Sequence, residues 1–553
     1  MARLSHRAGT RRPGPRAGRR RLLLTWLTVL SLLGVGLGWV VSSPLGGSPD
    51  DDYHLTSIWC PQPVEESCRT ATIDGEIRVE VPERIGDNSP CYAFHPETSA
   101  ECSLHFSDGK TRWAYRYDAG NYPGGFYRLH HLLVSPRVIV SVLAMRAVNV
   151  VLAVGLLSAI GVLLPAAVRR AYVLAAAASL VPLGVYFIAS NNPSSWALTG
   201  VLAYAAALYG ATRTGGGRAW ALTGLAGLGA LLCCLSRFDA AFYLFVVSMA
   251  YLFLVRWRRR HWPQCVLALL ASAAGLYLML LGGAGGHSGP ADPAAADPGL
   301  VRATLEALYR IPSYMFGMYG LGFGAGWADI HFEWAVPACM ILTAGAVCML
   351  GLRSWSWRKG LAILMVAGAM TGMPVVMSVM GIFPGLVGYQ PRYALPLLPV
   401  LLLILLVDHT SPDGEQDSGA GGISPITRAQ AILVVITMWV AATWAHYTVL
   451  QRYVQGMDEP DLINLDHEPE WWWDIPVSPM TVWALTLVAT TVVTVGVVHV
   501  LSSRPSDEGD VAPTAEPAPT PASGLATADD KAPGPQETDE TVTVLVDESE
   551  AVS

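Results

Sequence analysis

Three consecutive carboxylates, Asp50, Asp51 and Asp52, follow closely after a long apolar stretch of the chain. Like charges this close together raise one another's pKa unless a cation lies near them. Carboxylates in such a state can exchange protons. The triplet therefore indicates a reactive site, with a solvated helix end as the plain alternative.

Other polar residues lie where apolar stretches end, and we expect them on the same face of the membrane as the triplet. They are Asn192 in "SNNPSS", Arg237 and Asp239 in "LSRFDA", and Gln390, Arg392 and Tyr393 in "GYQPRYALP". A charge at the centre of a membrane helix costs about 2.5–3.5 kcal/mol, so such groups usually line a polar cavity. Taken singly, Arg237 could pair with Asp239 and Arg392 could anchor at the interface. Taken together, they predict a pocket that holds carboxylates and two guanidiniums.

The composition predicts a polytopic membrane protein. Of the 553 residues, 52% are apolar and 14% are charged, and the mean hydropathy is +0.39. These values are too apolar for a soluble globular chain of this length. A membrane-spanning helix needs about 20 apolar residues. By that measure we expect about twelve transmembrane helices in an all-α integral membrane fold, near 22–42, 138–166, 171–190, 196–212, 219–235, 238–255, 262–282, 335–352, 360–380, 393–407, 431–450 and 481–501.

The arginines predict the orientation of the chain. Eight of them precede the first apolar stretch, and others recur in alternate loops, as in "RWRRR" at 256–260. Because Lys and Arg collect in cytoplasmic loops, we expect both termini in the cytoplasm and the polar pocket on the outer face of the cell membrane. The expected parts are a cytoplasmic N-terminal segment, 1–21, a membrane domain, 22–501, with exported loops at 43–135, 283–334 and 451–480, and a disordered cytoplasmic tail, 502–553.

Four of the nine cysteines lie in the first exported loop. They are Cys60, Cys68, Cys91 and Cys102. An even number of cysteines in an exported loop indicates disulfides, and four cysteines allow three pairings. Pairing between neighbours in the sequence closes the shortest loops and is favoured, although the spacing leaves the other pairings open.

The sequence excludes some classes of partner. It contains no Walker loop, GxGxxG, HExxH or paired CxxC, so a nucleotide site and a structural zinc site have no support, and nothing indicates binding to nucleic acid. The net charge of −7 says little about partners, because 12 of the 43 Asp and Glu residues lie after Leu501. That segment is rich in Pro, Ala, Thr and acid, which is typical of disorder.

Four motifs together resemble a family of uncharacterised bacterial membrane proteins of the C-type (GT-C) membrane glycosyltransferase clan. "PDDDYH" at 49–54 resembles its P-D-E-x-x-H element, which includes His54, and "NNPSS" its N-P-[DS] turn. "GWADIHF" at 326–332 is similar to its G-W-x-D loop, with Trp327 and Asp329, and "GYQPRYALPLLP" to its Q-G-R-Y-x-x-P segment. Asp51 stands where the family has Glu, and Pro391 replaces the Gly before Arg392.

The resemblance implies a GT-C-like fold and a glycosyltransferase. Such an enzyme moves a sugar from a polyprenyl phosphate donor to an acceptor in the cell envelope, which would be a glycan, glycolipid or glycoprotein. It implies that Asp50 is the catalytic base, with Asp51 second, or that the two hold a divalent cation. Arg392 would bind the donor phosphate, with Arg237 in reserve, because a guanidinium meets phosphate oxygens bidentately. His54, Asn192, Asp239, Trp327, Asp329, Gln390 and Tyr393 complete the expected substrate-binding set.

Two other classes of function fit the same features. A transporter or flippase for an envelope glycolipid also has many helices and cavity-facing charges, but we find no internal repeat of the kind that transporters often show. A non-catalytic envelope scaffold is the third class. A scaffold does not require Asp50 and Arg392 to converge, so the distance between them discriminates.

Overall fold

The computed structural model describes most of the chain between residues 15 and 503. The described ranges are 15–86, 90–107, 109–284, 299–386, 388–407, 423–457, 463–467, 469–473 and 475–503. By compactness the chain divides into 1–510 and 511–553, and the second unit lies wholly outside these ranges. The disorder expected for the tail 502–553 therefore falls almost entirely outside the described residues, as do the first 14 residues of the expected N-terminal segment.

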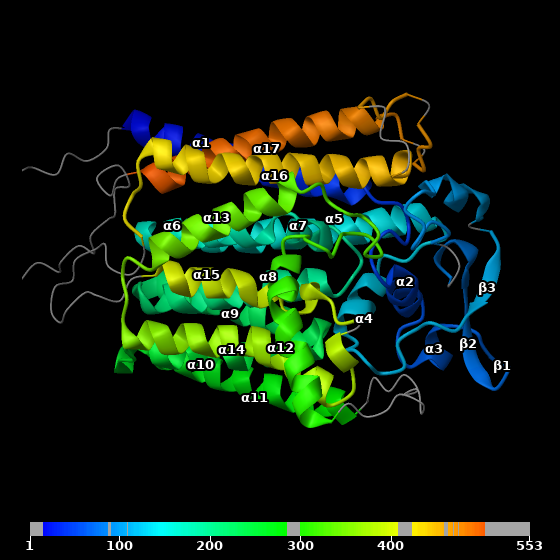
Figure 1. Ribbon diagram of the computed structural model, residues 1–553, viewed down its shortest axis with the longest axis horizontal. Coiled ribbons are helices and arrows are strands. Elements are labelled where there is room, and N and C mark those ends of the chain that lie inside the picture. The colour runs from blue at the N-terminus through cyan, green and yellow to red at the C-terminus, as the bar shows by residue number, and fades with distance from the viewer. Residues whose placement is uncertain are drawn as a thin grey trace, which may run out of the picture. The chain divides into compact units, whose positions relative to one another are not determined.

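Seven helices in the described ranges are long and apolar enough to cross a membrane. Their axes share one direction, and neighbours such as α1 and α17 pack together (Figure 1). The first already begins at Pro15, ahead of the expected span. The seven are α1 (Pro15–Val41), α5 (Val138–Leu163), α9 (Gly216–Ser236), α11 (Trp262–Ala284), α14 (Trp357–Val379), α16 (Arg428–Val454) and α17 (Pro479–Ser502).

The remaining expected spans are shorter or divided helices. Proline explains two of these, because it lacks an N–H and interrupts the helical hydrogen-bond ladder. Pro182 separates α6 from α7, and three prolines replace the start of the span at 393–407 with 3₁₀ turns. These elements are α6 (Ala166–Leu180), α7 (Leu183–Ile188), α8 (Ser194–Thr212), α10 (Phe238–Leu254), α13 (Ala335–Gly351), η5 (Pro391–Tyr393), η6 (Leu395–Leu397) and α15 (Leu398–Leu406). All twelve expected segments contain helix, while twelve membrane crossings remain a prediction.

Helix α8 forms the centre of the bundle, and every residue in it is buried. Small residues let it approach α9 closely. A Cβ on Gly200 would lie 2.7 Å from the carbonyl oxygen of Gly229, and a Cβ on Gly229 would lie 2.7 Å from that of Gly200. Membrane helices gain van der Waals contact from such close packing. Arg237 is the single residue between α9 and α10, and Asp239 lies in the first turn of α10.

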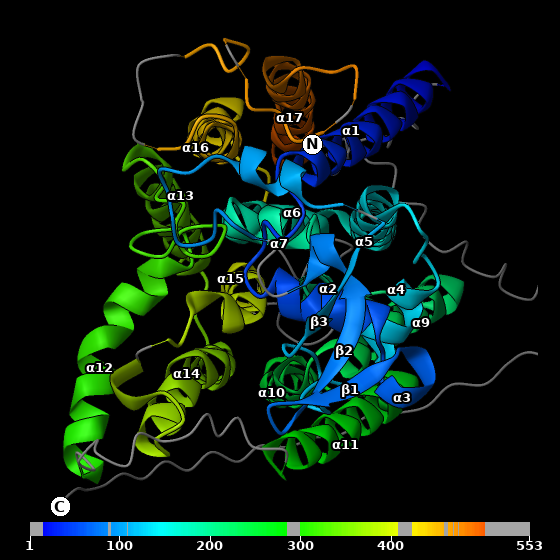
Figure 2. The ribbon, with the colours of Figure 1, turned by 90° about the vertical axis from the view of Figure 1, so that its right-hand side faces the viewer.

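The segment between α1 and α5, expected as a loop, is a folded unit at one end of the bundle. Figure 2 shows α2 over the helix ends and the sheet in front of it. Its strands form an antiparallel sheet in the order β1-β2-β3, with Thr70 opposite Val79 and Val79 opposite Ala114. The elements are α2 (Asp51–Trp59), α3 (Val64–Ser67), β1 (Thr70–Ile73), β2 (Glu76–Pro82), η1 (Glu83–Ile85), η2 (Ala100–His105), β3 (Thr111–Ala114) and α4 (Gly125–His131).

A helix also occupies part of the expected loop 283–334. Helix α12 (Leu300–Gly317) lies across the direction of α13 and α14 in both views (Figures 1 and 2). The predicted loop therefore contains a helix, which was not expected because only long uncharged stretches predict membrane spans. The charges of Arg302, Glu306 and Arg310 disqualify this segment as a span although its apolar residues recur at helical spacing.

Two disulfides join neighbouring cysteines in the segment between α1 and α5. Cys60 pairs with Cys68, and Cys91 pairs with Cys102. We predict that thiol titration of the denatured, unreduced protein will find five free thiols, which are those of Cys233, Cys234, Cys265, Cys339 and Cys348. Reduction before denaturation should raise the number to the full nine. Nine free thiols without reduction would contradict both bridges.

Candidate active site

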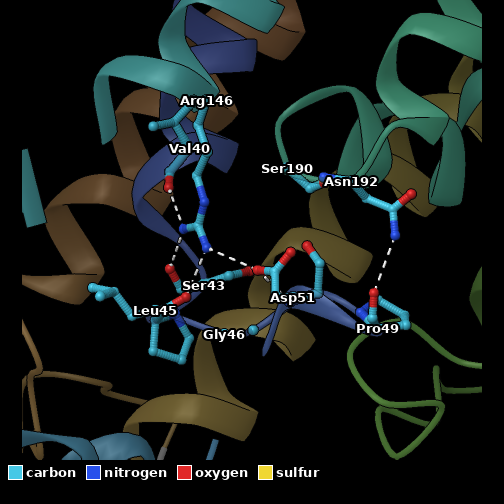
Figure 3. A network of polar contacts seen from close by, with 12 residues as sticks. Val40, Ser43, Leu45, Gly46, Pro49, Asp51, Arg146, Ser190 and Asn192 are labelled. Carbon is cyan, nitrogen blue, oxygen red and sulfur yellow. Dashed lines mark hydrogen bonds and ion pairs between the residues drawn. The ribbon is translucent and has the colours of Figure 1, made fainter. Parts of the chain in front are cut away.

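The connecting segment, residues 42–50, runs from the end of α1 to the start of α2 and positions the carboxylates. Arg146, the only charged residue of α5, holds its first part (Figure 3). Its Nη1 donates to the carbonyl oxygens of Val40 and Ser43 at 3.2 and 2.7 Å, and its Nη2 donates to that of Pro44 at 2.8 Å. The same Nη2 lies 3.5 Å from Oδ2 of Asp51. One guanidinium therefore ties α1, the connecting segment and α2 together.

Side chains from distant parts of the chain hold the rest of the connecting segment. Each donates to a buried backbone carbonyl, which would otherwise lose its hydrogen bonds to water at a cost. The donors are the Tyr92 hydroxyl to Leu45, Trp327 Nε1 to Gly46 at 2.9 Å, the Tyr186 and Tyr453 hydroxyls to Gly47 at 2.6 and 2.7 Å, and Asn192 Nδ2 to Pro49 at 3.0 Å. The path of the backbone is thus fixed up to the first carboxylate.

Asp50 ends this path with a left-handed backbone, at φ 61° and ψ 20°, and it precedes the first turn of α2. This conformation is uncommon outside glycine, although Asp tolerates it better than most residues. Oδ2 of Asp51 accepts a hydrogen bond from the Ser48 amide at 3.1 Å and so stabilises the turn. Because the surrounding contacts impose the turn, the Asp50 side chain points away from that of its neighbour.

Three guanidiniums surround the carboxylates. Oδ2 of Asp50 accepts a hydrogen bond from Arg392 Nη2 at 2.7 Å, and Oδ1 accepts one from Arg116 Nη2 at 3.2 Å. Arg116 follows β3 and also donates from Nη1 to Oδ2 of Asp52 at 2.6 Å. The side chain of Asp50 is 38% exposed, whereas those of Asp51 and Asp52 are 0% and 2% exposed. Only Asp50 of the three is open to a substrate.

The environments separate the pKa values of the three carboxyls. Burial raises the pKa of Asp51 to about 7, although Arg146 and the Ser48 amide oppose the shift. Burial likewise raises the pKa of Asp52 to about 6 against the effect of Arg116. Burial would also raise the pKa of Asp50, but the charges of Arg392 and Arg116 lower it to about 2. Asp50 is therefore ionised throughout the neutral range.

Arg392 has unused hydrogen-bonding capacity. Its side chain is 4% exposed, and its guanidinium lies over the rings of Phe187 and Tyr393, at 5.5 and 5.3 Å from their centroids. Its Nε and Nη1 have no hydrogen-bond partner among the described residues. A buried guanidinium that keeps unpaired donors beside a partly open carboxylate is suited to an anionic ligand, above all a phosphate.

Arg237 is the second expected phosphate partner, and it is already paired. Its Nε and Nη2 each donate to a carboxylate oxygen of Asp239 at 2.9 Å. Its guanidinium lies 5.1 Å from the ring centroid of Tyr393 and 5.7 Å from that of Tyr122. Arg237 therefore flanks the same tyrosine as Arg392 but has less free capacity, which favours Arg392 as the anion ligand.

His54 lies in an aromatic cluster next to the carboxylates. Its Nδ1 is 2.9 Å from the hydroxyl of Tyr127, and its ring packs against those of Tyr53 and Tyr122. Burial lowers the pKa of His54 to about 3, so the imidazole is neutral. The buried, neutral imidazole of His54 therefore joins α2 to α4, the helix that carries Tyr127.

Several expected substrate-binding residues instead contact the protein in this structure. Trp327 and Asn192 donate to the connecting segment, as described above. Asp329 accepts a hydrogen bond from Arg452 Nη2 at 2.8 Å, and Arg452 also donates to three carbonyls between Tyr92 and Thr98. The carbonyl of Gln390 accepts a hydrogen bond from Tyr314 at 3.0 Å. The residues brought together around Asp50 are Arg392, which contacts it, and Arg237 and Tyr393, since both guanidiniums lie over the Tyr393 ring.

The carboxylates do not fit the divalent cation, Mg or Mn, that the resemblance implies for Asp50 and Asp51. Within the described ranges, no group of three or more His, Cys, Asp or Glu residues could hold a metal ion. Both oxygens of Asp50 accept hydrogen bonds from arginines, and Arg146 lies beside Asp51. Three nearby guanidiniums would repel a cation, so the site is suited to an anion.

The sequence analysis missed Arg116 and Arg146. Arg146 carried a usable signal, because it is the only charged residue within the apolar stretch 138–166 and such residues usually mark a polar site. Arg116 carried none, since an arginine in an exported polar segment is unremarkable until β3 brings it to Asp52. Tyr92 and Arg452 are likewise ordinary residues in sequence.

One comparison with known proteins yields a match. The profile of the family described as Predicted membrane protein (DUF2142) matches residues 33–401, which is more than half of the chain. The matched range runs from α1 to α15 and includes Asp50, Arg146 and Arg392. No curated protein and no solved structure matches the chain significantly.

Arg146 should be essential for stability. We predict that Arg146→Met lowers the free energy of unfolding by about 3–5 kcal/mol, because it leaves Asp51 and three backbone carbonyls without their buried partner. The measurement is the midpoint of thermal unfolding of the purified protein in detergent. Arg302→Met is the matched control, since Arg302 is 74% exposed and makes a surface ion pair, which contributes little to stability. Equal midpoints for the two variants would refute the assigned role.

Proposed function

We propose a function from the premise that this chain belongs to the family of predicted membrane proteins DUF2142. It is a bacterial membrane glycosyltransferase of the GT-C type. It moves a sugar from a polyprenyl phosphate donor to an envelope acceptor at the outer face of the cytoplasmic membrane. The observation that carries the proposal is the contact between Asp50, the one partly open carboxylate of the triplet, and Arg392, a buried guanidinium with two donors to spare.

The reaction assigns one role to each of these residues. An acceptor hydroxyl attacks the anomeric carbon of the donor sugar, so a new C–O bond forms while the bond to the phosphate oxygen breaks. The hydroxyl proton passes to Asp50. Polyprenyl phosphate leaves with the bonding electrons, and Arg392 stabilises the charge that develops on its oxygens. Atoms and charge balance without a metal or a nucleotide.

Donor binding itself adjusts the base. A carboxylate with a pKa of about 2 is a poor proton acceptor, because the best general bases have a pKa near the working pH. A phosphate bound to Nε and Nη1 of Arg392 adds a negative charge next to Asp50, and like charges raise the pKa of a carboxyl. Donor binding therefore raises the pKa of Asp50 and makes it a better base. In the empty site Asp50 keeps its low pKa and stays deprotonated.

The arrangement of the chain supports a site on the outer face. Asp50, Arg116, Arg237 and Arg392 all belong to the end of the bundle where α2 lies (Figures 1 and 2). The arginine-rich loops, such as 256–260, connect the opposite helix ends. Because positive loops stay in the cytoplasm, the site faces outward and both termini face the cytoplasm. The two disulfides agree with an oxidising exterior.

The close contact also bears on the other two classes of function. A scaffold would tolerate a wide separation of Asp50 and Arg392, but their side chains are 2.7 Å apart. A carrier or flippase would use the same charges for binding alone. A carrier has no step in which a proton must pass to Asp50. Loss of sugar transfer in Asp50→Asn therefore separates the transferase from the carrier.

Asp50→Asn should slow sugar transfer about 10²–10⁴-fold, because it preserves the size of the side chain and removes the proton acceptor. The assay measures transfer from labelled lipid-linked sugars, extracted from the same cells, in membranes with equal amounts of each variant. Asp74→Asn is the matched control. Asp74 lies in the same folded segment, also has a positive φ of 55°, and its side chain is 81% exposed. Full activity of Asp50→Asn would contradict the proposed base.

Arg392→Lys should weaken use of the donor although the charge is kept. An ammonium cannot reproduce the planar fork of a guanidinium, and the loss of one or two charge-assisted hydrogen bonds predicts a decrease of about 10–100-fold in kcat/KM for the donor. The measurement is the rate of transfer as a function of donor concentration. Arg69→Lys, at a side chain that is 80% exposed, should behave like the unchanged protein. An unchanged kcat/KM in Arg392→Lys would contradict the proposal that Arg392 binds the donor phosphate.

A further inference from the structure

Helix α12 has an apolar face that no described part of the chain covers. Besides Leu300 at its first position, five of its side chains are large, apolar and exposed: Val301, Leu305, Leu308, Tyr309 and Phe316. At 100° per residue these five fall on one broad side of the helix. Leu305 and Tyr309 are 62% and 85% exposed. Exposed apolar side chains gathered on one side of a helix mark a binding surface.

Two other sides of α12 have different characters. The side that packs on the bundle carries small or buried residues, including Ala303, Ala307 and Gly317. Between this side and the apolar face runs a polar stripe, in which Arg302 Nε donates to Glu306 Oε1 at 2.8 Å. The helix thus separates contacts with protein, with water and with an apolar partner onto three different sides.

The direction of α12 identifies the partner as lipid. The helix lies across α13 and α14 (Figures 1 and 2), so in a membrane that α14 spans it runs along the bilayer surface. It packs directly on α14, whose exposed side chains, such as Leu364 and Val376, face outward in the same manner. Amphipathic helices in this orientation bury their apolar face at the boundary of headgroups and acyl chains.

We propose that α12 is an interfacial helix, and that its apolar face binds the acyl region of the membrane leaflet at the end of the bundle where α2 lies. The polar stripe then meets water and headgroups, and the small residues hold the helix to the bundle. This inference is independent of the proposed enzymatic activity, because it rests only on the faces and the direction of α12.

The same helix supports the turn that carries Arg392. The Tyr314 hydroxyl donates to the carbonyl oxygen of Gln390 at 3.0 Å. A Cβ on Gly317 would lie 2.7 Å from Cγ of Pro391, so the backbone of α12 contacts η5 closely. Lipid bound to one side of α12 thereby stabilises the position of Arg392 on the other. If the proposed function holds, this arrangement places the phosphate ligand near the level of lipid headgroups.

The test compares two introduced thiols that lie about 140° apart around α12, Leu305→Cys on the apolar face and Arg310→Cys at an exposed residue beyond the polar stripe. The protein in single-copy lipid nanodiscs is treated with a charged, membrane-impermeant maleimide, and modification is followed peptide by peptide with mass spectrometry. This readout keeps the native cysteines and requires no enzymatic activity. We expect Leu305→Cys to react at least ~10-fold more slowly than Arg310→Cys, because lipid covers only the apolar face.

Controls separate lipid from other causes of protection. Both thiols should react equally fast in denaturant, and Tyr309→Cys should be protected like Leu305→Cys, which guards against a local effect of one substitution. Equal rates for Leu305→Cys and Arg310→Cys in nanodiscs would overturn the proposal. Protection of Leu305→Cys in densely loaded vesicles but not in single-copy nanodiscs would also overturn it, since a second protein copy would then be the partner.

Discussion

The hydrogen bonds to the carbonyls of the connecting segment are the constraint on which the site depends. Residues 42–50 are irregular and largely buried, so neither a helix nor water can satisfy their backbone. Arg146, Tyr92, Trp327, Tyr186, Tyr453 and Asn192 supply the missing donors from six separate places in the chain. These hydrogen bonds to distant side chains hold the backbone of the connecting segment in one conformation, and that conformation sets the position of the Asp50 side chain.

The charges around Asp50 form the second layer of the arrangement. Arg116 serves Asp50 and Asp52 together, and Arg392 approaches from the other side, so the exposed carboxylate is held between two guanidiniums. Arg237 and Asp239 neutralise each other nearby. The cluster therefore keeps one buried arginine with spare donors rather than a surplus of acid, which explains why an anion suits it and a cation does not. Asp51, which is buried and lies beside Arg146, shapes the turn instead of meeting a substrate.

Helix α12 and the segment between α1 and α5 enclose this cluster from two directions. The α1–α5 segment contributes Arg116 and His54 through a small disulfide-bearing sheet and two short helices. The loop after α12 contributes Trp327, which donates to the connecting segment, and Asp329, which pairs with Arg452. Helix α12 itself contacts the turn of Arg392. Parts expected to be loops thus carry much of the site. Loops often carry functional residues, and here they are fixed by contacts with the bundle.

The sequence by itself determined the membrane class, the helical segments and the chemical candidates, because apolar length, charge at helix ends and cysteine number are local properties. Asp50, Arg237 and Arg392 were recognised on these grounds, and so was the favoured pairing of the four cysteines. Only the tertiary structure decided which candidates meet. It brought Asp50 to Arg392 across 342 positions and added Arg116 and Arg146. It also turned Trp327 and Asn192 toward the connecting segment and Asp329 toward Arg452. Such contacts depend on which distant segments of the chain lie close together in the fold. The spacing of residues along the chain does not reveal which segments these are.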